Sequence, residues 1–401
     1  MDRVRNPFAP GAGTPPPALV GREEILNDAQ VTIARVKAGR PEKSFLLIGL
    51  RGVGKTVLLN RIQEMAESAG YRAIFVEAPE NKRLPALLIP PLRQILLALD
   101  RLERVNEYVK RGLRVLKSFT IKFKPDMGDF DLGLDIDPEL GAADSGDLEI
   151  DLSELLFAVA QAAAARSVHI AIFIDEMQYL NEDELSALIM AIHKVAQKKM
   201  PLLLVGAGLP QLVGLTGKSK SYAERLFNFP TVGPLKPPDA KNALRKPVEN
   251  EGVKFREPAL DEIARVTQGY PYFLQEWGYH TWNIANASPI SLEDVRAAHT
   301  AVIQRLDESF FRVRFDRLTP REKDYLRAMA ELGPEPHRSG DIADVLGVGV
   351  QSVAPLRSGL IKKGMIFSPA HGDTAFTVPL FDEFMKRIMP EMKRRKSLSR
   401  R

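Results

Sequence analysis

The stretch from Phe45 to Asn60, FLLIGLRGVGKTVLLN, constrains the fold of this chain more than any other segment. Its apolar start, Phe45–Ile48, is typical of a buried parallel strand. Residues 49–56 then match G-x-x-x-x-G-K-T, a loop whose glycines let successive backbone N–H groups turn towards a phosphate. A helical pattern follows, and the N-terminus of a helix favours anions. The stretch therefore predicts a strand, a phosphate-binding loop and a helix that together hold a nucleoside triphosphate.

Two residues of this loop have specific predicted roles. Lys55 would reach the β- and γ-phosphates, and the hydroxyl of Thr56 would ligate Mg²⁺. The other positions predicted to contact the nucleotide are Gly49, Gly52, Val53, Gly54 and Val57. The expected cofactors are accordingly ATP or ADP, with Mg²⁺.

A second acidic element supports this interpretation. The segment 168–176, VHIAIFIDE, reads as a β-branched strand that ends in two carboxylates. Asp175 would hold Mg²⁺, directly or through water, and Glu176 would orient and deprotonate the attacking water. Together with the loop, the pair predicts an Mg²⁺-dependent ATPase with Lys55 and Glu176 as catalytic residues.

The composition excludes several other classes of protein. The 401 residues include no cysteine, so disulfides, thiolate metal sites and cysteine nucleophiles are ruled out. No stretch is long and apolar enough to span a membrane, and the N-terminus lacks the apolar core of a signal peptide. We therefore expect a cytoplasmic protein without a membrane partner. The net charge of +5 favours polyanionic partners only mildly.

The chain divides into five predicted regions. Strand patterns alternate with helical ones from the phosphate-binding loop onward, which predicts an α/β fold with a parallel sheet. Short strands are expected at 45–48, 71–78, 168–175, 201–205 and 231–235. The regions are a flexible Pro-rich arm at 1–18, a P-loop ATPase core at 19–235, a helical lid at 236–312, a winged helix-turn-helix at 316–390 and a basic tail at 391–401.

An insert at about 107–150 interrupts the alternation of strands and helices. Segments 119–124, 130–137 and 148–152 alternate apolar with charged residues, a period of two that favours strands. We therefore predict a β-rich, acidic insert that contacts a protein partner or a second copy, or is simply solvated. A calcium loop on Asp129, Asp131 and Asp135 is an alternative, but Gly133 falls one place early for that pattern.

Taken in order, these motifs make residues 19–311 resemble the AAA+ superfamily. The motifs are Val20-Gly21-Arg22-Glu23, the P-loop, Asp175-Glu176 and a helical lid. Within the superfamily, the chain is similar to origin-recognition-type initiators and to STAND and archaeal-type ATPases. The resemblance implies an αβα sandwich with strand order 5-1-4-3-2. It also implies an adenine clamped near Val20, Gly21 and Arg22; the alternative for this motif is a plain helix N-terminus.

The chain departs from many AAA+ motors at two places. Gly206-Ala207-Gly208 stands where a polar residue would sense the γ-phosphate, and Gln211, one turn on, is an alternative. In the lid, Gly269-Tyr270-Pro271 replaces a sensor arginine and is similar to the STAND lid motif, which implies that Pro271 packs against the nucleotide. A helix stop followed by a helix start explains the same residues equally well.

Arg225 precedes the predicted fifth strand. Related ATPases place an arginine there that reaches a γ-phosphate in the same chain or in a neighbouring subunit of a homo-oligomer. The alternative is a surface arginine paired with a nearby glutamate. The missing sensor side chains favour slow hydrolysis, and hence a switch rather than a fast motor.

The C-terminal pattern predicts a winged helix. Thr319, Pro320 and Glu322 form a helix start, and two further helices and a hairpin follow. The segment DIADVLGVGVQSVAPLRSGLIKKGMI resembles the winged domains of bacterial regulators and of origin-recognition ATPases. In that geometry the third helix enters the major groove of double-stranded DNA. The residues predicted to contact bases or phosphates are Arg338, Gln351, Ser352, Arg357, Lys362 and Lys363.

Two functions remain open at this point. In the first, the nucleotide state controls how the winged helix grips double-stranded DNA, with or without oligomerisation. In the second, the chain is a STAND-like signalling switch that acts through protein partners without DNA. Winged helices of such switches often pack on their own ATPase domain. Salt-dependent binding of duplex DNA separates the two.

Overall fold

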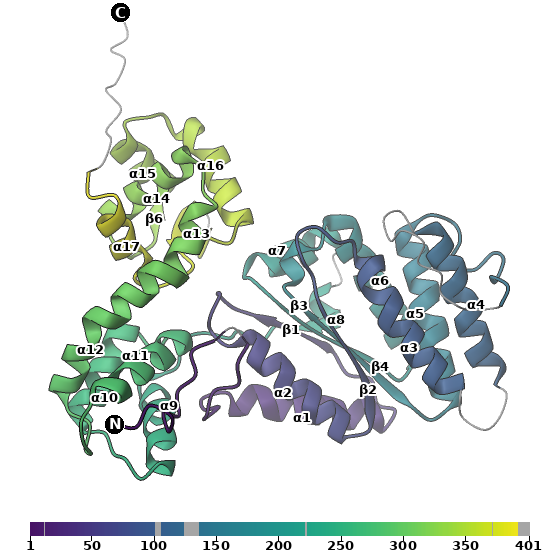
Figure 1. Ribbon diagram of the computed structural model, residues 1–401. Helices are drawn as coiled ribbons and strands as arrows, with labels where there is room; N and C mark the ends of the chain where they lie inside the picture. Colours follow the sequence, from purple (N-terminus) through teal and green to yellow (C-terminus); the bar gives the residue numbers. More distant parts are fainter. Residues whose placement is uncertain (12, 101–105, 124–135, 221–222, 371, 392–401) are drawn as a thin grey trace, which may run out of the picture. The chain divides into compact units, whose positions relative to one another are not determined.

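The computed structural model describes residues 1–11, 13–100, 106–123, 136–220, 223–370 and 372–391, and it divides into two compact units (Figure 1). The first, Arg22–Gly49 with Lys55–Val232, is called the sheet unit below. The second, Met1–Gly21 and Leu50–Gly54 with Gly233–Arg401, is called the lid unit. The chain therefore passes from one unit to the other and back within the phosphate-binding loop.

A five-stranded parallel sheet forms the centre of the sheet unit. Its strands are β1 (Ser44–Ile48), β2 (Tyr71–Glu77), β3 (His169–Asp175), β4 (Leu202–Gly208) and β5 (Phe227–Asn228). Their order is β2-β3-β4-β1-β5, which confirms the order 5-1-4-3-2. Every residue of β1 and β4 is buried, which explains their continuous apolar sequences. The fifth strand lies earlier in the chain than the predicted segment 231–235. Within that segment, Thr231 makes only an isolated bridge to Ile48.

Helices cover both faces of this sheet (Figure 1). The first helix α1 (Glu23–Lys37) and α2 (Lys55–Ser68) pack together on one face. The opposite face is covered by α3 (Leu84–Asp100), α5 (Leu148–Ala165) and α6 (Glu182–Gln197), and α4 (Glu107–Lys122) packs outside α3 and α5. A 3₁₀ turn, η1 (Met177–Tyr179), follows β3, while α7 (Gln211–Ser219) and α8 (Ala223–Leu226) follow β4. The predicted αβα sandwich is confirmed.

The prediction of a β-rich insert at 107–150 is wrong for the described residues. Residues 107–122 form α4, and residues 148–152 open α5, whose N-cap Asp147 accepts hydrogen bonds from the N–H groups of Glu149 and Ile150. The apolar residues of α4, among them Val109, Leu116 and Phe119, follow the helical period and are buried against the core. The segment 124–135, with the proposed calcium ligands, lies outside the described residues.

The lid unit begins with a helical region. It consists of α9 (Pro237–Asn250), α10 (Glu257–Thr267), α11 (Pro271–Ile284) and α12 (Leu292–Arg305), followed by a π-helical segment η2 (Leu306–Phe311) and α13 (Arg312–Asp316). Pro271 stands at the first position of α11, as proline prefers, and Gly269 has φ +68° just before it. Gly269 also lies so close to the carbonyl of Leu235 that a side chain at this position would collide with backbone.

The C-terminal part combines helices with a small antiparallel sheet. The helices are α14 (Pro320–Leu332), α15 (Ser339–Leu346), α16 (Val350–Lys362) and α17 (Phe381–Ile388). The strands β6 (His337–Arg338), β7 (Ile366–Phe367) and β8 (Asp373–Phe376) pair in the order β6-β8-β7. Thr319 and Glu322 form the predicted capping box at the start of α14. This arrangement is consistent with the predicted winged helix.

The prediction of a flexible N-terminal arm is wrong for Met1 to Phe8. Phe8 is 2% exposed and packs against Gly278 of α11, where a side chain would collide with its ring. The indole N–H of Trp282 donates to the carbonyl of Asp2 at 2.8 Å, and the Asn6 amide donates to Tyr279 and Asn283. These contacts hold the start of the chain on the lid.

Within the described ranges, no helix combines the length and the apolar character that crossing a membrane requires.

Candidate nucleotide site

The phosphate-binding loop leaves β1 at the carboxyl edge of the sheet. The N–H of Gly49 donates to the carbonyl of Gly208 at 3.1 Å, so the loop starts beside the end of β4. Gly52 and Gly54 have φ values of +79° and +95°, in the region that residues with a side chain avoid. Lys55, the first residue of α2, is 6% exposed. The loop therefore has the predicted backbone bend, and Lys55 at its end is buried.

Thr56 and Asp175, the two predicted Mg²⁺ ligands, lie together in the sheet unit. The Thr56 hydroxyl donates to Asp175 Oδ2 at 2.6 Å. Burial raises the pKa of Asp175, which is 4% exposed, while the hydrogen bond from Thr56 acts in the opposite direction. A hydroxyl and a carboxylate are oxygen donors of the kind that Mg²⁺ prefers alongside water and phosphate oxygens. No cluster of three His, Cys, Asp or Glu that could hold a metal occurs among the described residues.

Glu176 follows in a left-handed backbone conformation, with φ 55° and ψ 36°. This conformation is costly for a residue with a side chain, and such residues are concentrated at functional sites. The N–H of Glu176 donates to Asp175 Oδ1 at 2.8 Å. Its carboxylate accepts a hydrogen bond from the amide of Gln178, whose own oxygen accepts the N–H of Leu209 at 3.1 Å. Sequence reasoning did not find Gln178.

The glycines at the end of β4 have a packing reason. A side chain at Gly206 would collide with the sulfur of Met177, and one at Gly208 would lie 2.7 Å from Leu212 Cδ2 and 3.1 Å from Gln178 Oε1. Side chains of η1, α7 and β1 therefore fill the space beside these two glycines.

We expect Gly206→Ala to lower the free energy of unfolding by about 2 kcal/mol, since overpacking a filled core typically costs 1–3 kcal/mol. The new methyl group would overlap Met177 and would lie 2.7 Å from Leu46 Cδ2, and both side chains are buried. Denaturant unfolding of the variant would measure the loss. Gly214→Ala on α7 is the matched control, because no heavy atom lies within 4 Å of its added methyl group. Equal stability of the two variants would contradict the packing explanation.

The lid unit adds a residue that the sequence did not single out. A side chain at Gly52 would lie 2.9 Å from the ring and from the hydroxyl of Tyr270, so Tyr270 packs on the phosphate-binding loop. Tyr270 is 0% exposed, and its hydroxyl has no hydrogen-bond partner among the described residues. Burial raises the pKa of this phenol well above its usual range, and Arg314 and Arg51 oppose that shift. Pro271, the predicted contact, begins α11 immediately after it.

Arg314 of α13 is partly buried beside this tyrosine. Its guanidinium lies over the ring of Phe310, 3.8 Å from the centroid, and donates to the Phe310 carbonyl. Burial lowers the pKa of Arg314 to about 10, and the positive charge of Arg51 acts in the same direction. Arg314 is therefore a second cation, besides Arg51, that lies near Tyr270 and the loop. It lies outside the predicted lid motif Gly269-Tyr270-Pro271.

The remaining predicted nucleotide contacts lie at the start of α1. Val20 is 7% exposed, and Gly21 has φ +68°. A side chain at Gly21 would meet Asp239 of α9 at 2.8 Å, so this glycine is needed for close approach to the lid helix. Arg22 is the N-cap residue of α1 and is 9% exposed. Arg225 lies on α8, where it is exposed and forms no ion pair with another described residue.

The predicted DNA contacts divide into two groups. Arg357 donates to Thr374 Oγ1, Ser368 Oγ and the Asp373 carbonyl, at 2.7–2.9 Å, and thereby fixes α16 to the hairpin. Lys363 pairs with Glu322 at 2.7 Å and so supports the start of α14. These two cations therefore already have partners within the C-terminal domain. The other four are exposed: Arg338, Gln351, Ser352 and Lys362.

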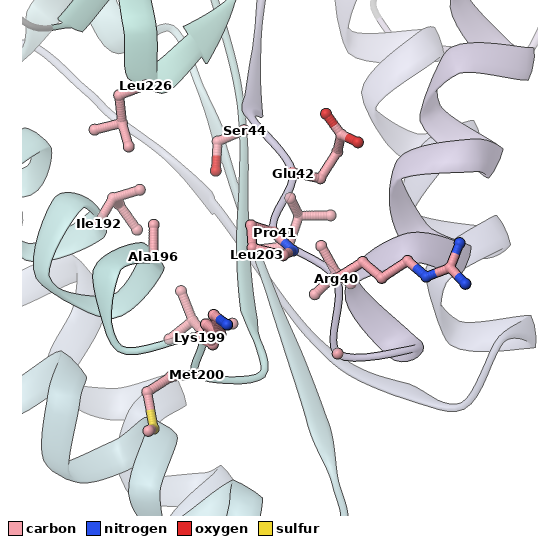
Figure 2. A pocket seen from close by; sticks show the side chains of 13 residues that line it. Arg40, Pro41, Glu42, Ser44, Ile192, Ala196, Lys199, Met200, Leu203 and Leu226 are labelled. Carbon is pink, nitrogen blue, oxygen red and sulfur yellow. The ribbon is translucent and has the colours of Figure 1, made fainter.

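A pocket lies elsewhere in the sheet unit, at the amino ends of β1 and β4 (Figure 2). Ile192, Ala196 and Met200 line it from α6 and the turn after α6, and Arg40 and Glu42 come from the loop before β1. Parallel strands bring their carboxyl ends to one edge, so this pocket is at the opposite edge from the phosphate-binding loop. It is therefore not the nucleotide site.

Two protein families match parts of the chain. Residues 18–205 match the AAA ATPase domain family, and residues 308–385 match a domain of unknown function, DUF8462. No match to a curated protein was found. The two matched segments are separated by most of the helical lid region.

Solved structures similar to the chain include the Walker-type ATPase paby2304 of Pyrococcus abyssi, at 17% identity and a TM-score of 0.56, covering 92% of this chain and 96% of that one. The Aeropyrum pernix Orc1 protein in complex with DNA is 18% identical, with a TM-score of 0.48 and coverage of 96% of both chains. The Thermotoga maritima RuvB Holliday junction branch migration motor is 16% identical, with a TM-score of 0.44 and coverage of 88% and 92%. The first likeness shows the fold alone, and the other two are too weak to support an argument about function.

Proposed function

We propose that this chain, whose residues 18–205 match the AAA ATPase domain family, binds ATP with Mg²⁺ and hydrolyses it slowly. The observation that carries this proposal is the hydrogen bond between Thr56 and Asp175, with Glu176 next in sequence. It joins the second residue of α2 to the end of β3, so that two oxygen donors for Mg²⁺ meet beside a carboxylate that can act as a base.

Each residue then has a defined task. Lys55 neutralises charge on the β- and γ-phosphates, while Thr56 and Asp175 hold Mg²⁺. A Mg²⁺ ion held by these two residues would supply positive charge against the phosphate oxygens. Glu176 takes the proton of the attacking water. Hydrolysis is slow because β4 contributes no polar side chain to the γ-phosphate, and this makes the nucleotide state long-lived enough to serve as a switch.

The second part of the proposal is that the nucleotide state controls double-stranded DNA binding by the C-terminal winged helix. The support is a continuous contact path within the lid unit. Tyr270 packs on the phosphate-binding loop, and its ring lies 4.8 Å from that of Phe273. The ring of Phe311, at the end of η2, lies 6.1 Å from that of Phe273 and 5.2 Å from that of Phe384 on α17. Arg387 of α17 also pairs with Asp307 at 2.7 Å. A movement of the lid would therefore carry the C-terminal domain with it.

We expect duplex DNA to bind the full chain in a salt-dependent manner and to stimulate ATP turnover. Replacing both Arg338 and Lys362 by Ala should weaken binding about 10-fold and lower the slope of log K against log salt by about two, because each lost phosphate contact releases about one counterion fewer. Fluorescence anisotropy at two salt concentrations measures both quantities. Lys110→Ala, which removes an exposed cation of α4, is the control.

A second candidate function is a STAND-like switch that binds protein instead of DNA. The observation that favours it is that Arg357 and Lys363 form hydrogen bonds and an ion pair within the C-terminal domain. Two of the six side chains predicted to contact DNA are therefore bound to other residues of the chain. Tightly retained ADP in the purified chain, without affinity for duplex DNA at low salt, would support this function and contradict the first.

The insert is proposed as the surface for a protein partner or for self-association. Its described residues expose four large apolar side chains, Tyr108, Ile121, Leu140 and Ile150, by 49–88%. Exposed apolar side chains are available for contact with a partner, and they mark an interaction surface where they form a contiguous patch. For the homo-oligomer, Arg225 is proposed as the residue that reaches the nucleotide of a neighbouring subunit. A turnover number that rises with protein concentration and loses this dependence in Arg225→Ala would support that role.

A further inference from the structure

The end of β4 lacks a polar side chain of its own, but an amide reaches it from the turn η1. Gln178 accepts the N–H of Leu209, the first residue after β4, at 3.1 Å. The nitrogen of the same amide donates to the Glu176 carboxylate. One side chain therefore joins the predicted catalytic carboxylate to the backbone at the tip of the neighbouring strand.

The packing around Gly208 shows that this amide has taken up space left free by β4. A side chain at Gly208 would lie 3.1 Å from Gln178 Oε1, which is closer than ordinary van der Waals contact. β4 pairs with β3 on one side and with β1 on the other, so its tip lies between the strands that carry Asp175 and the phosphate-binding loop. A polar group at this position is next to the site of phosphate chemistry even though no residue of β4 provides it.

We propose that Gln178 is a positioning residue for ATP hydrolysis. It holds the Glu176 carboxylate at a fixed position relative to the backbone at the end of β4. This inference rests on the proposed function, because it requires Glu176 to act as the base. A carboxylate has two oxygens. The bond from Gln178 fixes one of them and leaves the other to accept the proton of the attacking water.

The backbone of Glu176 explains why such a restraint matters. Glu176 follows the last residue of β3, its backbone is in the left-handed conformation, and its side chain is only partly buried. Packing alone therefore restrains its rotamers weakly. Misplacement of a catalytic group by about 1 Å can cost about 100-fold in rate. A neutral amide holds the carboxylate without adding a charge beside it.

The test is steady-state ATP turnover by the full chain carrying Gln178→Ala. We expect kcat to fall about 10- to 100-fold, with KM within about threefold of wild type, because the amide acts on the chemical step and not on nucleotide binding. Gln63→Ala on α2 is the matched control, since this glutamine also donates its amide to a glutamate, at 2.8 Å, on the outer part of the helix. Its kcat should equal that of wild type.

A double-mutant cycle with Glu176→Gln separates positioning from general disturbance of the fold. If Gln178 acts only through the Glu176 carboxylate, Gln178→Ala should cause little further loss in the Glu176→Gln background. A full additional loss would overturn the inference, as would a kcat for Gln178→Ala equal to or above that of wild type. Failure of the proposed function is a different result: wild type and Glu176→Gln would then show the same turnover.

Discussion

Lys55→Ala weakens ATP binding by about 100-fold or more and leaves no measurable turnover. Lys55 is the first residue of α2, is 6% exposed, and follows two glycines in left-handed conformations. Hydrogen bonds to charged groups are worth about 1.5–3 kcal/mol each, and this lysine is expected to contact two phosphates. Isothermal titration calorimetry with ATP and Mg²⁺ measures the loss of affinity.

The control for this change is Lys198→Ala, which removes an exposed lysine just after α6 in the same unit. It should bind ATP as wild type does. Thermal unfolding without nucleotide should show that Lys55→Ala keeps its fold, because the substitution removes a buried charge and leaves a good helix former. Unchanged ATP affinity in a folded Lys55→Ala protein would rule out the assignment of the phosphate-binding loop.

The sequence was most informative where a function depends on consecutive residues. The strand–loop–helix at 45–60 and the strand that ends in Asp175 and Glu176 are local patterns, and both were predicted correctly as structure. Thr56 and Asp175 were both predicted as Mg²⁺ ligands, and their side chains lie within hydrogen-bonding distance. The strand order came from a family resemblance, and the structure agrees with it.

The insert shows how a short window misleads. In a strand, Phe119 and Ile121 would point to the same face, and the alternation of FTIKFK suggests this. In α4 they point to different faces, since Phe119 is 0% and Ile121 is 59% exposed. Six residues fit both periods equally well. The whole of residues 107–122 fits only the helical period, and Asp147 before two further acidic residues was an available signal for the start of α5.

Contacts between distant residues were beyond the reach of the sequence. Gln178 meets Leu209, and Tyr270 meets Gly52, across 31 and more than 200 positions respectively. Only indirect signals existed. Gly206-Ala207-Gly208 indicated only that β4 ends without a polar side chain, and not that Met177 and Gln178 lie against this end. Similarly, Gly269-Tyr270-Pro271 indicated a helix start, and the tyrosine's place on the loop depends on the tertiary fold.

The second large effect is expected for Glu176→Gln, which should cut kcat by about 100-fold or more while ATP affinity changes little. Gln has the shape of Glu and can still accept the hydrogen bond from Gln178, so the turn η1 should keep its geometry. It cannot take a proton from water, and a general base contributes about 10²–10⁴-fold to a rate. Single-turnover hydrolysis of bound ATP measures the chemical step without a contribution from product release.

Glu182→Gln is the matched control, because it removes an exposed carboxylate a short distance along the chain, in the first turn of α6. Its turnover should equal that of wild type. Comparison of the two variants shows whether turnover depends on the base at Glu176 or on the loss of any negative charge nearby. If Glu176→Gln hydrolysed ATP within threefold of wild type, the attacking water would have to be oriented by another group. The left-handed turn at Glu176 would then need a purely structural reason. If the protein binds ATP but hydrolyses it only when Glu176 is intact, then Glu176 sets the lifetime of the ATP-bound state.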